Sequence, residues 1–396
     1  MDLILSKEQE FVKKTAREFA ERELAPIAGD IDEKGEIPKK IWEKLARYHM
    51  ISIPIPKEYG GAGGDYISYS IVVEEISKKC ASTGVMVSGV ASLFGWPILK
   101  FGTEEQKEKY LKPLITGVKQ GFFALTEPNA GTDAASQQTI AKRSGDYYIL
   151  NGSKCFITNG AKADFGIVFA MTDRSKGVKG ISAFIVEKGF EGFTIGKHEN
   201  KMGVRGTNTT ELIFKDVKVP QENLLGKEGK GFNIAMATLD GGRIGVASQA
   251  LGISQGALDE TVKYIKQRKQ FGKPLSFFQG LQWIVSEMAT RINAARLLIY
   301  DAADKKNKGL PYTKEAAMAK LYATRTAVYV VDRAVQLHGG YGYIKDYPVE
   351  RMYRDAKITE IYEGTAEVQR MVIASKITMD SIRNGYKNKC CKIVNL

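Results

Sequence analysis

The 396-residue chain has few of the side chains that bind metals or form disulfides. Its cysteines and histidines are few, and none of them has the spacing of a CxxC or HExxH motif. This scarcity argues against a metal centre and a disulfide framework, and it favours reduced thiols in the cytoplasm. The N-terminus has no basic region followed by an apolar stretch, so we expect no export signal. The residues concerned are Cys80, Cys155, Cys390, Cys391, His49, His198 and His338.

Clustered charge of one sign is also missing, although the formal net charge is +13. Lysine and arginine alternate with glutamate, and no long block of basic residues occurs. We therefore do not expect nucleic acid as a partner, because its recognition requires a clustered basic face. The positive excess would still attract a small molecule that carries several phosphates.

A long, purely apolar run is absent too. The uncharged stretch from Cys80 to Leu99 has the length of a membrane span, but serine, threonine, glycine and proline interrupt it. We interpret this stretch as a buried helix that forms the wall of a pocket, and we expect no membrane insertion.

The sequence lacks the signature of a dinucleotide-binding fold. Gly226, Gly229 and Gly231 do not match GxGxxG, and strands do not alternate with helices in the way that builds a doubly wound sheet. Direct NAD binding is therefore not expected.

What is present is a pattern of apolar residues that changes twice. Positions 1–119 have helical periodicity, beginning with a capping box of Ser6 and Gln9. Positions 120–226 alternate apolar and polar residues, which predicts a β domain. Positions 227–380 predict a helix bundle whose longest helices span 277–308 and 312–337, and the basic segment 381–396 predicts a mobile tail. The fold class is therefore α+β.

Glu363 is a candidate base. Ile361 and Tyr362 precede it and Gly364 follows it, so its carboxylate is expected against apolar surface. Such a setting raises the pKa of a carboxyl group and suits proton abstraction near neutral pH. From these residues alone, a solvated or salt-bridged surface glutamate is the alternative.

Other segments have compositions that suit ligands. Hydroxyl groups and small residues at 123–133 predict either a loop that holds phosphate oxygens or an ordinary turn. Phe156 and Thr158 share one face of a predicted strand, as a planar ligand requires and as many half-buried strands do. Gly241 and Gly242 each weaken a predicted helix by about 1 kcal/mol, which indicates close packing or a nearby ligand. His338 could be a general base, although histidine beside a helix end is more often structural.

Five motifs stand out along the chain: LTEPNAGTD at 125–133, FITNG at 156–160, RKQFG at 268–272, QLHGGYG at 336–342 and YEGT at 362–365. Through these motifs the chain, from about Leu5 to Lys376, resembles the flavin-dependent acyl-CoA dehydrogenase family, and it looks most like the short-chain, butyryl-CoA type of anaerobic bacteria. The segments 231–251 and 335–370 carry the closer resemblance to the short-chain type.

The resemblance implies a helical N-terminal domain, a β-sandwich-like middle domain and a C-terminal four-helix bundle, assembled as a homotetramer (a dimer of dimers) with one FAD per subunit. One group of residues would hold the flavin and its pyrophosphate, with Thr158 near N5; a second would reach the FAD of a neighbouring subunit; a third would complete the adenosine side. In that order the cofactor residues are Phe123, Leu125, Thr126, Gly131, Thr132, Phe156, Ile157 and Thr158; Arg268, Phe271, Gln279, Gln336, Gly339 and Gly340; and Thr365, Glu367 and Gln369.

The resemblance also implies a reaction. Glu363 would remove the α-proton of an acyl-CoA thioester while a hydride passes from the β-carbon to flavin N5, or the reverse in enoyl-CoA reduction. The Glu363 backbone N–H would stabilise the thioester oxygen. Related subfamilies place their base directly before the arginine that corresponds to Arg243, but this chain has Gly242 there, so the base must be Glu363. The implied substrate-binding residues are Thr132, Asp240, Gly241, Gly242, Arg243, Tyr362 and Gly364.

Electron-transfer flavoprotein is the electron partner that the resemblance implies. The acyl group stays open among crotonyl, acrylyl and aryl-acrylyl thioesters, with four carbons favoured by the resemblance. An acyl-CoA oxidase and a DNA-binding relative of the same fold are the remaining alternatives.

Overall fold

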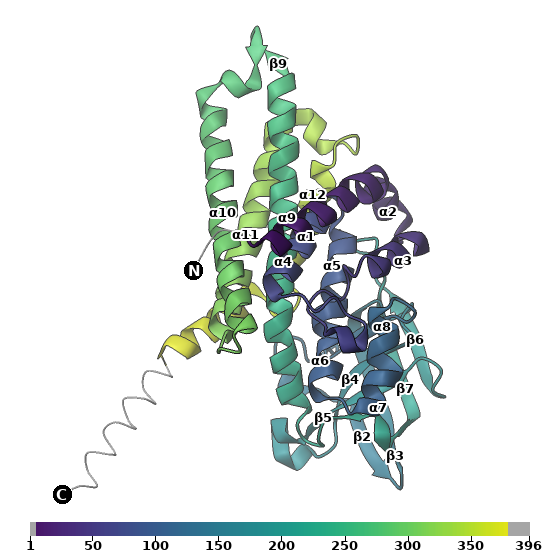
Figure 1. Ribbon diagram of the computed structural model, residues 1–396. Helices are drawn as coiled ribbons and strands as arrows, with labels where there is room; N and C mark the ends of the chain where they lie inside the picture. The colour runs from purple at the N-terminus through teal and green to yellow at the C-terminus, as the bar shows by residue number, and fades with distance from the viewer. Residues whose placement is uncertain (1–4, 379–396) are drawn as a thin grey trace, which may run out of the picture.

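The computed structural model describes residues 5–378, which form a helical region, a sheet and a second helical region in chain order (Figure 1). This is the α+β architecture that the sequence predicts. The predicted mobile tail at 381–396 lies outside the described residues.

The N-terminal region consists mainly of helices. The predicted capping box is confirmed at the start of the first helix, where the Gln9 N–H donates to the Ser6 hydroxyl at 3.2 Å and the Ser6 N–H donates to the Gln9 side chain at 3.0 Å. The helices are α1 (Lys7–Phe19), α2 (Ala28–Lys34), α3 (Lys39–Arg47), α4 (Tyr66–Ser77), α5 (Ala81–Gly89), α6 (Trp96–Phe101), α7 (Glu104–Gln106) and α8 (Lys112–Ile115).

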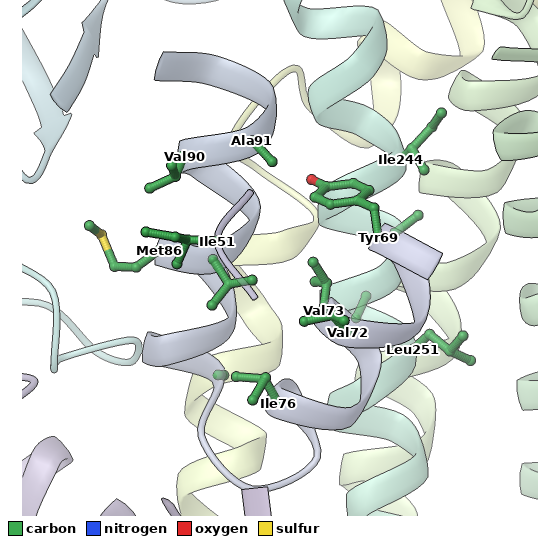
Figure 2. Close-up of a cluster of buried hydrophobic side chains, with 14 of the residues drawn as sticks. Ile51, Tyr69, Val72, Val73, Ile76, Met86, Val90, Ala91, Ile244 and Leu251 are labelled. Atoms are coloured by element: carbon green, nitrogen blue, oxygen red, sulfur yellow. The ribbon is translucent and has the colours of Figure 1, made fainter. Parts of the chain in front are cut away.

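The uncharged stretch at 80–99 becomes α5, a π-helical turn (Val90–Phe94) and the start of α6. In the part of the chain that the structure describes, Ala81–Phe101 is the one helical segment long and apolar enough to span a membrane. However, 67% of its apolar window is buried inside the protein. Val87, Val90 and Ala91 are buried in the same hydrophobic core as Tyr69 of α4 and Ile244 of the long C-terminal helix (Figure 2). The prediction of a buried helix is confirmed.

The middle region is one eight-stranded sheet in the order β6-β7-β3-β2-β4-β5-β8, with β1 added in parallel to β4. Its two halves pack face to face, because rings from both meet in one core: Tyr148 lies 4.9 Å from Phe184, and Phe122 lies 6.1 Å from Phe193. The strands are β1 (Gly121–Ala124), β2 (Ile140–Ser144), β3 (Tyr147–Thr158), β4 (Phe165–Met171), β5 (Ile181–Glu187), β6 (Phe193–His198), β7 (Thr209–Pro220) and β8 (Leu224–Leu225).

Side chains on the two faces of β4 pack alternately against the helices and within the sheet region. Phe165, Ile167 and Phe169 face the helical core, whereas Val168 and Ala170 face the core within the sheet. Both faces of the strand are therefore buried, as its almost uninterrupted apolar sequence requires.

The C-terminal region contains α9 (Gly231–Gln267), α10 (Gln279–Asn307), α11 (Thr313–His338) and α12 (Val349–Thr359). The prediction that the segments at 277–308 and 312–337 are the longest is wrong, because α9 has 37 residues and continues through both glycines at 241–242. Their backbone stays helical because α9 is buried along most of its length by α4, α5 and α11. The strands β9 (Lys269–Gln270) and β10 (Lys273–Pro274) form a hairpin that projects at one end of the long helices (Figure 1).

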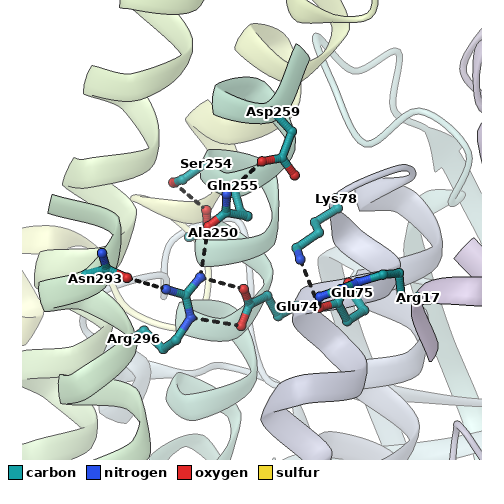
Figure 3. A network of polar contacts seen from close by, with 10 residues as sticks. All are labelled: Arg17, Glu74, Glu75, Lys78, Ala250, Ser254, Gln255, Asp259, Asn293 and Arg296. Atoms are coloured by element: carbon teal, nitrogen blue, oxygen red, sulfur yellow. Dashed lines mark hydrogen bonds and ion pairs between the residues drawn. The ribbon is translucent and has the colours of Figure 1, made fainter. Parts of the chain in front are cut away.

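Ion pairs of two neighbouring glutamates on α4 link α4 to the bundle and to α1 (Figure 3). Arg296 on α10 donates to Glu74 on α4 at 2.7 Å, and also to the Gln255 side chain on α9 at 3.0 Å. Glu75 accepts from Arg17 and Lys78 at 3.2 and 2.8 Å. These contacts hold α4 and α9 to α10, and α1 to α4.

Candidate active site

The loop that carries Glu363 follows α12 and has a left-handed backbone. The φ angle is +52° at Glu363 and +96° at Gly364, a conformation that side chains other than glycine rarely adopt. Glu363 is partly exposed as a residue, but its Oε2 atom is buried and finds no hydrogen-bond partner among residues 5–378. A strained backbone together with an unpaired buried carboxylate oxygen is typical of a functional site.

The Glu363 carboxylate occupies space that a side chain on α9 would need. A Cβ atom on Gly242 would lie 1.9 Å from Oε2 of Glu363. Burial raises the pKa of Glu363 to about 7, against the opposing effect of the Lys320 and Arg243 charges. A carboxyl group with this pKa can exchange a proton near neutral pH.

Hydrogen bonds of three side chains, those of Lys320, Gln369 and Tyr362, hold the Glu363 loop in place. Lys320 on α11 is 1% exposed, and its Nζ donates to the carbonyl oxygen of Tyr362 at 2.5 Å and to that of Gly364. Nε2 of the buried Gln369 donates to the Gly364 carbonyl at 2.8 Å. The Tyr362 hydroxyl donates to Gln249 on α9. The loop is thus anchored on both sides of Glu363.

The predicted substrate residues on α9 lie beside this loop. Arg243 is buried and donates to Asp240 at 2.5 Å, while the Thr313 hydroxyl donates to the other Asp240 oxygen at 2.6 Å. Nε of Arg243 is buried and finds no partner in the described part of the chain. The segment 240–243, Tyr362 and Gly364 are therefore brought together, and Thr132 lies on an exposed loop of the sheet region.

The predicted flavin residues of the middle region lie on two adjoining segments. The Cys155 N–H donates to the Thr126 carbonyl at 3.0 Å, and Lys154 donates to the Leu125 carbonyl at 3.1 Å. Leu125 is buried, Phe123 and Thr126 are partly exposed, and Gly131 and Thr132 are exposed. A Cβ on Gly131 would meet nothing within 4 Å, so the loop borders open space.

The second of these segments does not keep the regular alternation that the sequence predicts. A register shift between Lys154 and Ile157 interrupts the pairing of β3 with β7, and φ is +57° at Phe156. Phe156 is consequently 65% exposed, Ile157 is buried, and Thr158 is partly exposed. An exposed ring beside an open loop fits a planar group such as a flavin.

The second predicted group lies around a cavity of about 670 Å³ at the far end of α11. Arg268, Gln336, Gly339 and Gly340 line this cavity, and a Cβ on either glycine would meet nothing within 4 Å. A guanidinium, an amide and open backbone suit a phosphorylated ligand. The predicted residues Phe271 and Gln279 are exposed and do not line the cavity.

His338 is a structural residue at this cavity. It is buried, its Nδ1 lies 2.8 Å from the Ala334 carbonyl oxygen, and its ring stacks on Tyr264 at 4.3 Å. Burial lowers the pKa of His338 below its usual value. The structural alternative for His338 is therefore the better description.

The cavity and Glu363 are far apart in one chain. Lys320, which contacts the Glu363 loop, and His338 are separated along α11 by roughly 27 Å at the usual helical rise. Of the third predicted group, Thr365 is partly exposed, Glu367 is exposed and Gln369 faces the loop interior. The predicted residues therefore fall into three groups: those at the Glu363 loop and α9, those on two segments of the sheet region, and those at the cavity near the end of α11.

Comparison with known proteins shows which family the chain belongs to. The acyl-CoA dehydrogenase N-terminal, middle and C-terminal domain families match residues 6–118, 122–217 and 229–378. The chain belongs to the acyl-CoA dehydrogenase family.

Individual acyl-CoA dehydrogenases are similar over nearly the whole chain. The short-chain specific acyl-CoA dehydrogenase of Clostridium acetobutylicum is 60% identical, over 95% of this chain and 100% of that protein. The butyryl-CoA dehydrogenase structure of Megasphaera elsdenii has a TM-score of 0.93 at 54% identity, over 95% and 100% of the two chains. A chain in the structure of the electron-transferring flavoprotein of Acidaminococcus fermentans has a TM-score of 0.94 at 55% identity, over 96% and 100%.

Sequence reasoning missed Lys320, Gln249 and Lys154 as parts of this acyl-CoA dehydrogenase site. A signal for Lys320 exists, since it lies among Ala316, Ala319, Ala323 and Ala327 at helical spacing and so falls on the buried face of α11. A charged residue on such a face requires buried partners. No comparable sequence signal identifies the backbone carbonyls that Lys320 contacts.

Proposed function

We propose that this acyl-CoA dehydrogenase removes the α-proton and the β-hydride of a short-chain acyl-CoA, of the butyryl-CoA to crotonyl-CoA type, or catalyses the reverse reduction. The observation that carries the proposal is the Glu363 carboxylate, whose Oε2 is buried, unpaired and set into the space left by Gly242. The Clostridium relative is named as a short-chain specific acyl-CoA dehydrogenase and the Megasphaera relative as a butyryl-CoA dehydrogenase, which favours the short-chain class.

In the oxidative direction the Cα–H bond breaks and its proton moves to the Glu363 carboxylate. The Glu363 N–H donates to no acceptor within residues 5–378, and we propose that it donates to the thioester oxygen, where negative charge develops. Arg243, held by Asp240, would face the thioester side of the substrate. Water would be limited by the burial of the carboxylate.

The cofactor that we propose is FAD, because acyl-CoA dehydrogenases are flavoproteins. When bound, FAD supplies the acceptor for the β-hydride, so that a Cα–Cβ double bond forms and the charge balances. Phe156 and Thr158 would hold the flavin, and the loop from Thr126 to Thr132 would hold its phosphates. Open space at Gly131 supports this placement.

We further propose that the enzyme works as a homotetramer and passes its electrons to electron-transfer flavoprotein. The cavity around Arg268 and Gln336 lies roughly 27 Å from the Glu363 loop along α11, so it suits the FAD of a neighbouring copy rather than its own. The relation to a chain in the Acidaminococcus flavoprotein structure supports the electron partner.

Glu363→Gln tests the proposed base. The variant keeps the size of the side chain but cannot accept the α-proton, so turnover should fall by several orders of magnitude. Anaerobic mixing of the flavin-loaded protein with butyryl-CoA and stopped-flow absorbance would measure the loss of flavin colour. Binding of butyryl-CoA, measured by its effect on the flavin spectrum, should remain.

Glu287→Gln is the matched control, because Glu287 pairs with Arg291 on the exposed face of α10. It should reduce the flavin at the rate of the unaltered enzyme. Near-normal flavin reduction by Glu363→Gln would overturn the assignment of the base.

A further inference from the structure

The Lys320 ammonium group is a buried charge that faces backbone rather than a carboxylate within hydrogen-bond distance. It is 1% exposed and forms no ion pair within 4.0 Å among the residues that the structure describes. Its two hydrogen bonds instead go to the carbonyl oxygens of Tyr362 and Gly364, on either side of Glu363. Burying an ammonium group is costly, so this contact requires an explanation beyond packing.

The geometry of the peptide group provides one. In a planar trans peptide the carbonyl oxygen and the N–H group point in opposite directions. Lys320 holds the Tyr362 carbonyl oxygen, and the N–H on the same peptide plane belongs to Glu363. The lysine therefore aims the Glu363 N–H away from α11. The second contact, to Gly364, fixes the peptide after the left-handed residue.

We propose that Lys320 is a positioning residue that clamps the two carbonyl groups flanking Glu363 and thereby aims the Glu363 N–H at the thioester oxygen of the substrate. This inference rests on the proposed function, because it assigns Lys320 a role in stabilising the enolate formed when Glu363 takes the α-proton. Lys320 itself acts through the loop and does not touch the reacting atoms.

The charge of Lys320 also acts on the Glu363 carboxylate. Burial lowers the pKa of Lys320, and the positive charge of Lys320 in turn lowers the pKa of Glu363. The other charged or titratable groups that face this pair are Arg243 on α9, Tyr69 on α4, and Tyr362 and Glu360 near the loop. Of these, Arg243 is the remaining cation that favours ionised Glu363.

Lys320→Met tests the clamp, because methionine keeps most of the side-chain volume but neither donates nor carries charge. Removing control of one oxyanion donor should lower the rate of flavin reduction by butyryl-CoA by about 10²–10³-fold, with little change in the concentration of butyryl-CoA for half-maximal rate. The rate of the unaltered enzyme should rise as pH increases through about 7, as Glu363 loses its proton. In Lys320→Met this rise should move to higher pH, since a charge that lowers the pKa of Glu363 is gone.

A second readout needs no turnover. Acetoacetyl-CoA ionises readily to an enolate, so the pH at which the bound ligand ionises reports how well the site stabilises negative charge at the thioester oxygen. That ionisation should require a higher pH in Lys320→Met, and Lys320→Arg should restore part of both effects.

Lys201→Met is the matched control. Lys201 also donates to loop carbonyls, those of Val204 and Thr207, but it lies in the sheet region, and the substitution removes these hydrogen bonds. It should leave ligand ionisation and the pH profile unchanged. A Lys320→Met protein that folds and shows the unaltered pH profile, rate and ligand ionisation would overturn the inference. If Glu363→Gln also remained active, the proposed function would fail as well, and the two failures can therefore be told apart.

Discussion

Glu363 and Gly242 depend on each other at the scale of single residues. Glycine inside a helix costs about 1 kcal/mol relative to alanine, yet α9 has Gly242 at a buried position. The absence of a side chain at Gly242 leaves the space that Oε2 of Glu363 occupies. Helix stability and site geometry therefore oppose each other at this one residue.

Gly242→Ala separates the two effects. The added methyl group would lie 1.9 Å from Oε2, so the carboxylate must move, and we expect flavin reduction by butyryl-CoA to slow by about 100-fold. The thermal midpoint should stay the same or rise, because alanine is the better helix former. Stopped-flow absorbance and circular dichroism would measure the two quantities.

Gly280→Ala on α10 is the control, because a Cβ there meets nothing within 4 Å. It should change neither rate nor folding to a comparable degree. A fully active Gly242→Ala enzyme would show that Glu363 does not need the position it holds against α9.

At the scale of elements, one buried ion pair joins β3 to the loop after β1. Lys154 is 0% exposed and donates to Glu127 at 2.8 Å and to the Gln137 side chain at 3.1 Å. Glu127 also accepts from the N–H groups of Gln138 and Thr139 at 2.5 and 3.0 Å. Burial alone would raise the pKa of Glu127, but Lys154 and these hydrogen bonds together lower it. The loop that borders the proposed flavin site is thus held by a charge within the sheet.

Lys154→Met should leave Glu127 as an uncompensated buried charge. We expect a loss of about 3–5 kcal/mol in the stability of the sheet region, seen as a lower thermal midpoint, and weaker retention of flavin on gel filtration. Adding Glu127→Gln should recover part of the stability, because the unpaired charge is removed. Equal midpoints for the single and double variants would contradict this account of the pair.

Sequence patterns predict the type of each element better than its length or its contacts with other elements. The shift from helical to alternating periodicity near 120 and the capping box at Ser6 are local signals, and the structure has both. The length of α9 was not predictable from local propensity, because burial by neighbouring helices overrides the two glycines. The role of Lys320 depends on carbonyl groups 42 and 44 residues away, which no local pattern contains.

At the scale of the whole molecule, the hairpin end of the bundle exposes aromatic surface. Phe271 is 92% exposed, Phe277 is 66% exposed and Trp283 is 64% exposed. Each such ring gains about 1.5–3 kcal/mol when it is fully buried, so their grouping at one end favours contact with another copy. The cavity around Arg268 begins beside the same hairpin.

Phe271→Asp should therefore weaken both self-association and cofactor binding. A carboxylate at this position cannot be buried without a partner, so sedimentation velocity should show smaller species than the unaltered protein does. Because the Arg268 cavity is proposed to complete the FAD site of a neighbour, the flavin-to-protein ratio after gel filtration should fall in parallel. Phe11→Asp, the same substitution of an exposed ring on α1, should change neither quantity. Smaller species that retained full flavin would separate the two properties and show that each chain binds its cofactor alone.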